Sequence, residues 1–168
     1  GFIGATLCAI FYVRKNKIPI WKMADALAPS IALGHAFGRL GCLMTGCCYG
    51  KACSLPWSIT FPRDHVTHPI AVHPTQLYES FFNFALFAGL AWIYRKKKFD
   101  GQVFALYLMA YAFLRAVNEL FRGDYEPSKH LGILTPGQLT GILIMSAGIA
   151  MWFFCSSQIR KEKLQTQE

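Results

Sequence analysis

Two arginines interrupt long apolar stretches of this 168-residue chain, and they are its most informative residues. Arg39 lies in "GHAFGRLGCLMTGCCYG" (34–50), and Arg115 lies in "YAFLRAVNELFRGD" (111–124). A charge inside an apolar span costs about 2.5–3.5 kcal/mol, and such residues usually face a bundle interior or a water-filled cavity. A guanidinium holds phosphate or carboxylate oxygens through paired N–H donors and stays protonated. The two arginines therefore indicate a site for an anionic group.

Other polar residues recur at helical spacing in three otherwise apolar segments. The sets are His35 and Arg39; Gln76, Glu79 and Asn83; and Tyr111, Arg115, Glu119 and Arg122. Residues three and four positions apart share one face of a helix, so each set forms a polar stripe. Three stripes at one depth predict a lined cavity. The plainer alternative is an internal Arg115–Glu119 ion pair that serves only to satisfy both charges.

Two histidines are candidates for proton transfer or substrate positioning. His35 lies one turn before Arg39, and His73 opens "HPTQLYE", which is typical of a helix start with Thr75 or His73 near the cap. A histidine beside arginines and a carboxylate is placed for acid–base work. Hydrogen bonding at the membrane interface is the alternative role for each.

Four cysteines form the pattern C-x4-C-C-x4-C: Cys42, Cys47, Cys48 and Cys53. Structural zinc sites favour two to four residues between paired ligands, so this spacing does not favour a metal. Packing thiols are the first expectation, a Cys48–Cys53 disulfide the second and a metal site the third. We therefore expect neither a metal nor a cofactor.

Five apolar segments must position these residues: 1–13 (truncated), 24–46, 75–94, 101–121 and 136–156. The last four have the ~20 residues that a membrane span requires. Composition agrees, because 54% of residues are hydrophobic and 15% charged, against about a quarter charged in soluble domains. The sequence predicts an all-α, polytopic transmembrane helix bundle with four complete spans and one truncated amino-terminal span. We expect 1–168 to be a single integral membrane domain, a fragment of a larger protein.

The basic residues predict the orientation of this bundle. Eleven of the seventeen lysines and arginines lie in three clusters at the ends of apolar runs: Arg14, Lys15, Lys17 and Lys22; Arg95, Lys96, Lys97 and Lys98; and Arg160, Lys161 and Lys163. The positive-inside rule places these clusters and the carboxy terminus in the cytoplasm, with loops 47–74 and 122–135 outside. The same distribution argues against nucleic acid as a partner, despite the net charge of +8.

The motifs together resemble one family. "GHAFGRLGCLMTGCCYG", "HPTQLYES", "YAFLRAVNELFRGD" and "LTPGQL" occur in the order and spacing of the prolipoprotein diacylglyceryl transferases. The resemblance implies a multi-pass enzyme of the bacterial inner membrane, usually with seven spans. Such an enzyme moves a diacylglyceryl group from phosphatidylglycerol to the lipobox cysteine thiol of a prolipoprotein signal peptide, and glycerol phosphate leaves.

The resemblance also implies roles for particular residues. Arg39 and Arg115 match arginines that the family requires, Tyr111 and Glu119 accompany the second, and Gly50 and His73 match further motif positions. The family's H-G-G motif would lie before Gly1, so the fragment itself would be inactive. Some members carry asparagine at the position of Cys42 and glutamate at that of Cys47.

The candidate residues fall into two groups. The catalytic candidates are Arg39, Arg115, His73, Glu119, Tyr111 and His35; those for binding phosphatidylglycerol are Arg39, Arg115, Gly50, Arg122 and Gln76. The site should face the extracytoplasmic leaflet, next to membrane lipid. Two alternatives remain open: a transporter or channel that uses the polar stripes, and a thiol- or metal-binding membrane protein without transferase activity.

Overall fold

A computed structural model describes residues 2–123 and 136–165, and α-helices make up most of that part of the chain. Its five helices are α1 (Phe2–Lys15), α2 (Ile20–Thr45), α3 (Thr75–Tyr94), α4 (Gln102–Glu119) and α5 (Pro136–Gln165). Within those ranges there is no strand, only isolated β-bridges. The all-α prediction is confirmed, and the helices lie within a few residues of the predicted apolar segments, except that α5 continues to Gln165, well past the predicted end at 156. Most of the predicted 122–135 loop falls outside the described residues.

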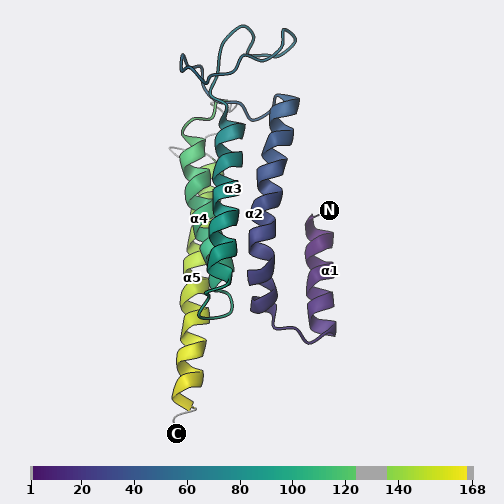
Figure 1. The fold of residues 1–168 in the computed structure, drawn as a ribbon, viewed down its shortest axis with the longest axis vertical. Helices are drawn as coiled ribbons and strands as arrows, with labels where there is room; N and C mark the ends of the chain where they lie inside the picture. The colour runs from purple at the N-terminus through teal and green to yellow at the C-terminus, as the bar shows by residue number, and fades with distance from the viewer. Residues whose placement is uncertain (1, 124–135, 166–168) are drawn as a thin grey trace.

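Helices α2 to α5 lie side by side, and α1 lies beside only one half of α2 (Figure 1). The most extensive contacts join α2 to α3 and α4 to α5. Ala28 and Ala32 of α2 are fully buried against Leu90 of α3 and Val103 and Tyr107 of α4. Small side chains let helix backbones approach closely, and so these alanines allow the central helices to pack tightly.

Length and hydropathy together qualify one helix among the described residues as a membrane span, Gly137–Gln158 within α5. The buried polar residues of α3 and α4, which include Glu79 and Asn83 on α3 and Asn118 on α4, interrupt the apolar character of those helices. The helical part of the fold prediction is thus observed directly. The number of spans remains a proposal.

At one end of the bundle, Asp25 connects α2 to the start of α4. Its side chain is fully buried near the start of α2. Its carboxylate accepts hydrogen bonds from the backbone N–H groups of Gly101 (2.9 Å) and Phe104 (3.0 Å), and Lys97 Nζ lies 2.9 Å away. The first turn of α4 has no acidic residue of its own. Asp25 therefore supplies the negative charge that stabilises a helix amino terminus.

The segment 46–74 folds over the opposite end of the bundle (Figure 1). Gly46, in the left-handed conformation (φ 75°), caps the end of α2, and antiparallel bridges pair Gly50 with Arg122 and Ala52 with Val72. Helix α3 starts where the motif predicts: Pro74 occupies the cap position, between His73 and Thr75, and makes no side-chain cap hydrogen bond. The Thr75 hydroxyl instead donates to the carbonyl of Cys48 (2.7 Å), so it fastens the loop to α3.

Candidate active site

The two arginines meet at one carboxylate. Arg39 Nη2 of α2 lies 2.9 Å from Glu79 Oε1 of α3, and Arg115 Nη1 of α4 lies 3.3 Å from Glu79 Oε2. The Glu79 side chain is 5% exposed, whereas those of Arg39 and Arg115 are 20% and 18% exposed. The carboxylate is thus buried beneath two guanidinium groups that keep one side open. This arrangement orients both arginines and leaves N–H donors for a ligand.

Further charges extend the cluster along α4. Asn118 Nδ2 donates to Glu79 Oε2 (2.8 Å), and Glu119 Oε2 lies 3.7 Å from Arg115 Nη2 and 4.0 Å from Arg122 Nη1. The three guanidinium groups and two carboxylates leave a net charge of plus one. That charge complements a single phosphodiester anion.

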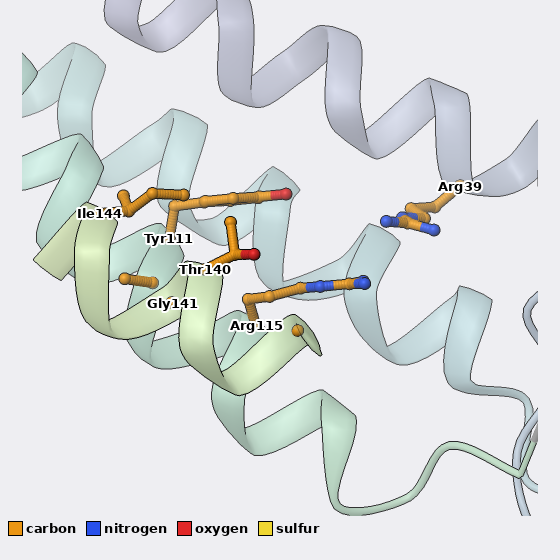
Figure 2. Close-up of a pocket in the computed structure, with 8 residues that line it drawn as sticks. Arg39, Tyr111, Arg115, Thr140, Gly141 and Ile144 are labelled. Carbon is orange, nitrogen blue, oxygen red and sulfur yellow. The ribbon is translucent and has the colours of Figure 1, made fainter. Parts of the chain in front are cut away.

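Both arginines line one cavity of about 360 Å³, with the other lining residues coming from α4 and α5. They are Tyr111, Ala112, Gly137, Thr140, Gly141 and Ile144. Figure 2 shows Arg39 and Arg115 projecting from different helices, with Thr140 and Tyr111 on the α4–α5 side. The cavity therefore has a cationic side and an adjoining wall of small and apolar residues. A phospholipid has the same division, between a charged headgroup and hydrocarbon chains.

His35 lies beside this cavity rather than apart from it. Its ring centroid is 5.0 Å from that of Tyr111, a cavity residue, and its Nδ1 lies 3.2 Å from the hydroxyl of Tyr107. A hydrogen bond at one ring nitrogen fixes the orientation of an imidazole. Tyr107 therefore positions His35 next to Tyr111.

His73 lies in a different cavity. This second space, of about 350 Å³, is lined by Leu55, Trp57, His73, Tyr78, Phe82, Val117, Asn118 and Phe121. The hydroxyl of Tyr78 lies 3.2 Å from His73 Nδ1 and accepts a hydrogen bond from the Trp57 indole (2.8 Å). The structure thus does not bring His73 together with the arginines. Asn118 lines the second cavity and binds Glu79, which links the two sites.

The substrate-binding candidates Gln76 and Gly50 hold the loop and do not line the arginine cavity. Gln76 is buried, and its Nε2 donates to the carbonyl of Cys47 (2.7 Å). A Cβ added to Gly50 would lie 2.5 Å from His73 Cβ and 2.9 Å from the carbonyl oxygen of Phe121. Gly50 is therefore required for the close approach of three backbone segments.

Sequence reasoning missed the central role of Glu79 and ranked Glu119 as the partner of Arg115. Glu79 approaches Arg115 more closely than Glu119 does. The signal was present, because Glu79 belongs to a polar stripe on an apolar helix. Tyr107 and Thr140 were also missed, and their surroundings in the sequence offer no comparable signal.

The state of the cysteines contradicts the disulfide alternative. All six are free thiols, so the Cys48–Cys53 disulfide is not formed. The sulfur atoms of Cys42, Cys47 and Cys48 lie within 4.8 Å of one another at the end of α2.

Comparison with known proteins agrees with the motifs. The family model described as prolipoprotein diacylglyceryl transferase matches residues 1–154. The chain is 36% identical over 163 residues to the phosphatidylglycerol–prolipoprotein diacylglyceryl transferase of Clostridium tetani, covering 96% of this chain and 64% of that protein. It is 37% identical over 155 residues to the enzyme of that name from Sinorhizobium medicae, covering 90% of this chain and 53% of the relative.

The chain thus spans between about half and two thirds of the length of these relatives. The match to the family model includes α1 to α4, the first part of α5 and the arginine cluster described above. The chain belongs to the prolipoprotein diacylglyceryl transferase family.

Proposed function

We propose that the protein containing this chain transfers a diacylglyceryl group from phosphatidylglycerol to the lipobox cysteine thiol of prolipoproteins. The observation that carries the proposal is the convergence of Arg39 and Arg115, from separate helices, on Glu79 at the wall of one cavity. The net charge of plus one fits the phosphodiester headgroup, and the apolar wall fits the start of the acyl chains.

The reaction is a displacement at carbon. The cysteine sulfur forms a bond to the glycerol carbon of the diacylglyceryl group, and the bond from that carbon to the phosphate oxygen breaks. The electron pair leaves with that oxygen, so glycerol phosphate departs with one more negative charge than the phosphodiester had. Arg39 and Arg115 are placed to stabilise this growing charge. Such electrostatic stabilisation is strongest in a water-poor site.

The attacking thiol must lose its proton, because the thiolate is the nucleophile. Of the two candidate histidines, His35 has the better position, since its ring contacts a residue of the arginine cavity. We therefore assign proton acceptance to His35. Tyr107 acts as a positioning residue through its contact with His35 Nδ1. His73 belongs instead to the neighbouring aromatic cavity.

We also propose that the helices form a multi-pass bundle in the bacterial inner membrane. The α1–α2 connection, the α3–α4 turn and the carboxy-terminal end of α5 lie at one end of the bundle (Figure 1). All three basic clusters belong to these segments. This common end would be cytoplasmic under the positive-inside rule, which places the 46–74 loop and the arginine cavity toward the extracytoplasmic leaflet.

The test is transfer of labelled diacylglycerol from phosphatidylglycerol to a lipobox peptide by the full-length protein. Arg39→Ala and Arg115→Ala should each lower the rate about a hundredfold or more, as expected when a donor to a developing oxyanion is lost. Arg63→Ala removes an exposed arginine of the 46–74 loop and should retain activity. If both cavity variants fold and label the peptide at the normal rate, the proposed function is wrong.

A further inference from the structure

The three clustered thiols are not packed as core residues. Cys47 is exposed, and Cys42 and Cys48 are half-buried. Their sulfur atoms nevertheless lie within 4.8 Å of one another. Packing alone, which the sequence favoured, does not explain why three thiols gather where one of them is open to the surroundings.

The backbone around these thiols is held from both sides. Thr75 and Gln76, both buried at the start of α3, donate side-chain hydrogen bonds of 2.7 Å to the carbonyls of Cys48 and Cys47. The Cys47 N–H donates to the carbonyl of Cys42 (3.1 Å), which closes the end of α2 onto the loop. Cys48 itself has a φ of 63°, a conformation that side-chain-bearing residues adopt rarely. The loop is therefore fixed in a geometry that brings the three side chains together.

We propose that Cys42, Cys47 and Cys48 form a three-thiolate site for a soft d10 cation of the Zn²⁺ and Cd²⁺ class. Zinc–sulfur bonds of about 2.3 Å at tetrahedral angles separate the sulfur atoms by about 3.8 Å. The observed separations of up to 4.8 Å close to that value by small side-chain rotations. A fourth ligand position is open on the side of the exposed Cys47, where water can complete the tetrahedron.

Charge favours occupation of this site. Binding releases the three thiol protons and leaves a complex of three thiolates and one divalent cation, with a net charge of minus one. Arg39 lies one helical turn before Cys42 on α2, so a guanidinium is close enough to offset that charge. The site would thus adjoin the arginine cavity without using its ligands.

Titration of the purified, metal-free full-length protein with Cd²⁺ tests this inference. Thiolate-to-cadmium charge-transfer absorption should rise to saturation at one equivalent, and it should also appear when Cd²⁺ displaces Zn²⁺ from the zinc-loaded protein, because thiolates favour the softer ion. The variants Cys42→Ser, Cys47→Ser and Cys48→Ser should each weaken binding about a hundredfold or more. Cys53→Ser is the matched control, because Cys53 lies in the same loop outside the cluster, and it should bind normally.

Each variant is first compared with the parent by thermal unfolding without metal, so that loss of folding is distinguished from loss of a ligand. Absence of charge-transfer absorption in the folded parent would overturn the inference, as would an affinity for Cd²⁺ in the three cluster variants equal to that of the parent. The titration contains neither phospholipid substrate nor peptide. Its outcome is therefore independent of the proposed transferase activity.

Discussion

At the residue scale, Glu79 determines how the two arginines are presented. A guanidinium alone in an apolar bundle has several rotamers and no fixed direction, whereas two that share one buried carboxylate are preoriented. Such preorientation lowers the cost of arranging donors around a developing charge. We therefore propose that Glu79 is a positioning residue that does not itself touch the reacting atoms.

We predict that Glu79→Gln lowers kcat for peptide labelling about tenfold or more without raising KM for phosphatidylglycerol. The glutamine keeps the size of the side chain but leaves both guanidinium groups misaligned and the cluster more positive. Removing one partner of a buried ion pair should also lower the free energy of unfolding by about 3 kcal/mol. Steady-state kinetics and chemical denaturation measure the two effects.

Two matched variants sharpen this test. Glu119→Gln should have a smaller effect on kcat, because its carboxylate lies farther from Arg115. Asp64→Asn removes an exposed carboxylate of the 46–74 loop and should change neither quantity. A Glu79→Gln variant with normal kcat would show that the shared carboxylate does not position the arginines.

At the element scale, the 46–74 loop depends on one close backbone approach. The Gly50 N–H donates to the His73 carbonyl (3.0 Å), and the Lys51 N–H donates to that of Phe121 (2.9 Å). These bonds connect the loop to the start of α3 and the end of α4. They therefore hold the ends of two helices that carry the arginine cluster.

We predict that Gly50→Ala is strongly destabilising, with a loss of roughly 2 kcal/mol or more in unfolding free energy, because its methyl group would overlap backbone atoms that cannot rotate away. Gly41→Ala is the control: a Cβ at Gly41 meets nothing within 4 Å, and alanine favours helix by up to about 1 kcal/mol. Thermal unfolding should separate the two variants. Equal stability of both would contradict the close approach at Gly50.

A second element-scale prediction concerns the α3–α4 turn. Burial acts to lower the pKa of Lys97, but hydrogen bonds to Asp100 and Asp25 outweigh it and hold that pKa above its ordinary value of 10.5. A raised pKa means that the folded state binds the proton more tightly. The stabilisation is therefore complete below pH 10.5 and is lost as the pH rises through the folded-state pKa.

The difference in Tm between the parent and Lys97→Met should accordingly be largest near neutral pH and should shrink at strongly alkaline pH. Lys98→Met, which removes an exposed charge of the same turn, should not reproduce this narrowing. Thermal unfolding from about pH 8 to about pH 12 covers the titration. A difference that stays constant over this range would show that Lys97 does not contribute through its charge.

At the scale of the whole molecule, local sequence patterns predicted where the helices lie in the chain better than they predicted which helices contact one another. Apolar runs determined the approximate helix bounds, and polar spacing identified the faces that carry Arg39, Glu79 and Arg115. Spacing within a helix does not say which helix it faces, so the shared carboxylate could not be assigned. The sequence also could not indicate that Asp25 caps α4, because its partners lie 76 and 79 residues away in the chain. The sequence could not indicate that His73 lines the second cavity, because adjacency to a helix start does not specify a cavity.

The arrangement of charge over the molecule gives the last prediction. The 47–74 loop has two basic residues, Lys51 and Arg63, in 28 positions, whereas the 95–101 turn has four in seven. These segments lie at opposite ends of the bundle (Figure 1). Because basic loops are retained in the cytoplasm, we expect the 47–74 loop to be extracytoplasmic and the 95–101 turn cytoplasmic.

Single cysteines introduced into a cysteine-free full-length protein measure this directly. A membrane-impermeant maleimide should label Ser54→Cys in intact cells whose outer layers admit the reagent, and should label Lys96→Cys only after the inner membrane is permeabilised. Both positions are exposed, so reactivity reports the side of the membrane and not burial. Labelling of Lys96→Cys in intact cells would show that the orientation is the reverse of the one proposed here. It would also remove the arginine cavity from the leaflet in which a translocating prolipoprotein presents its cysteine, and so the membrane orientation and the proposed function are tested together.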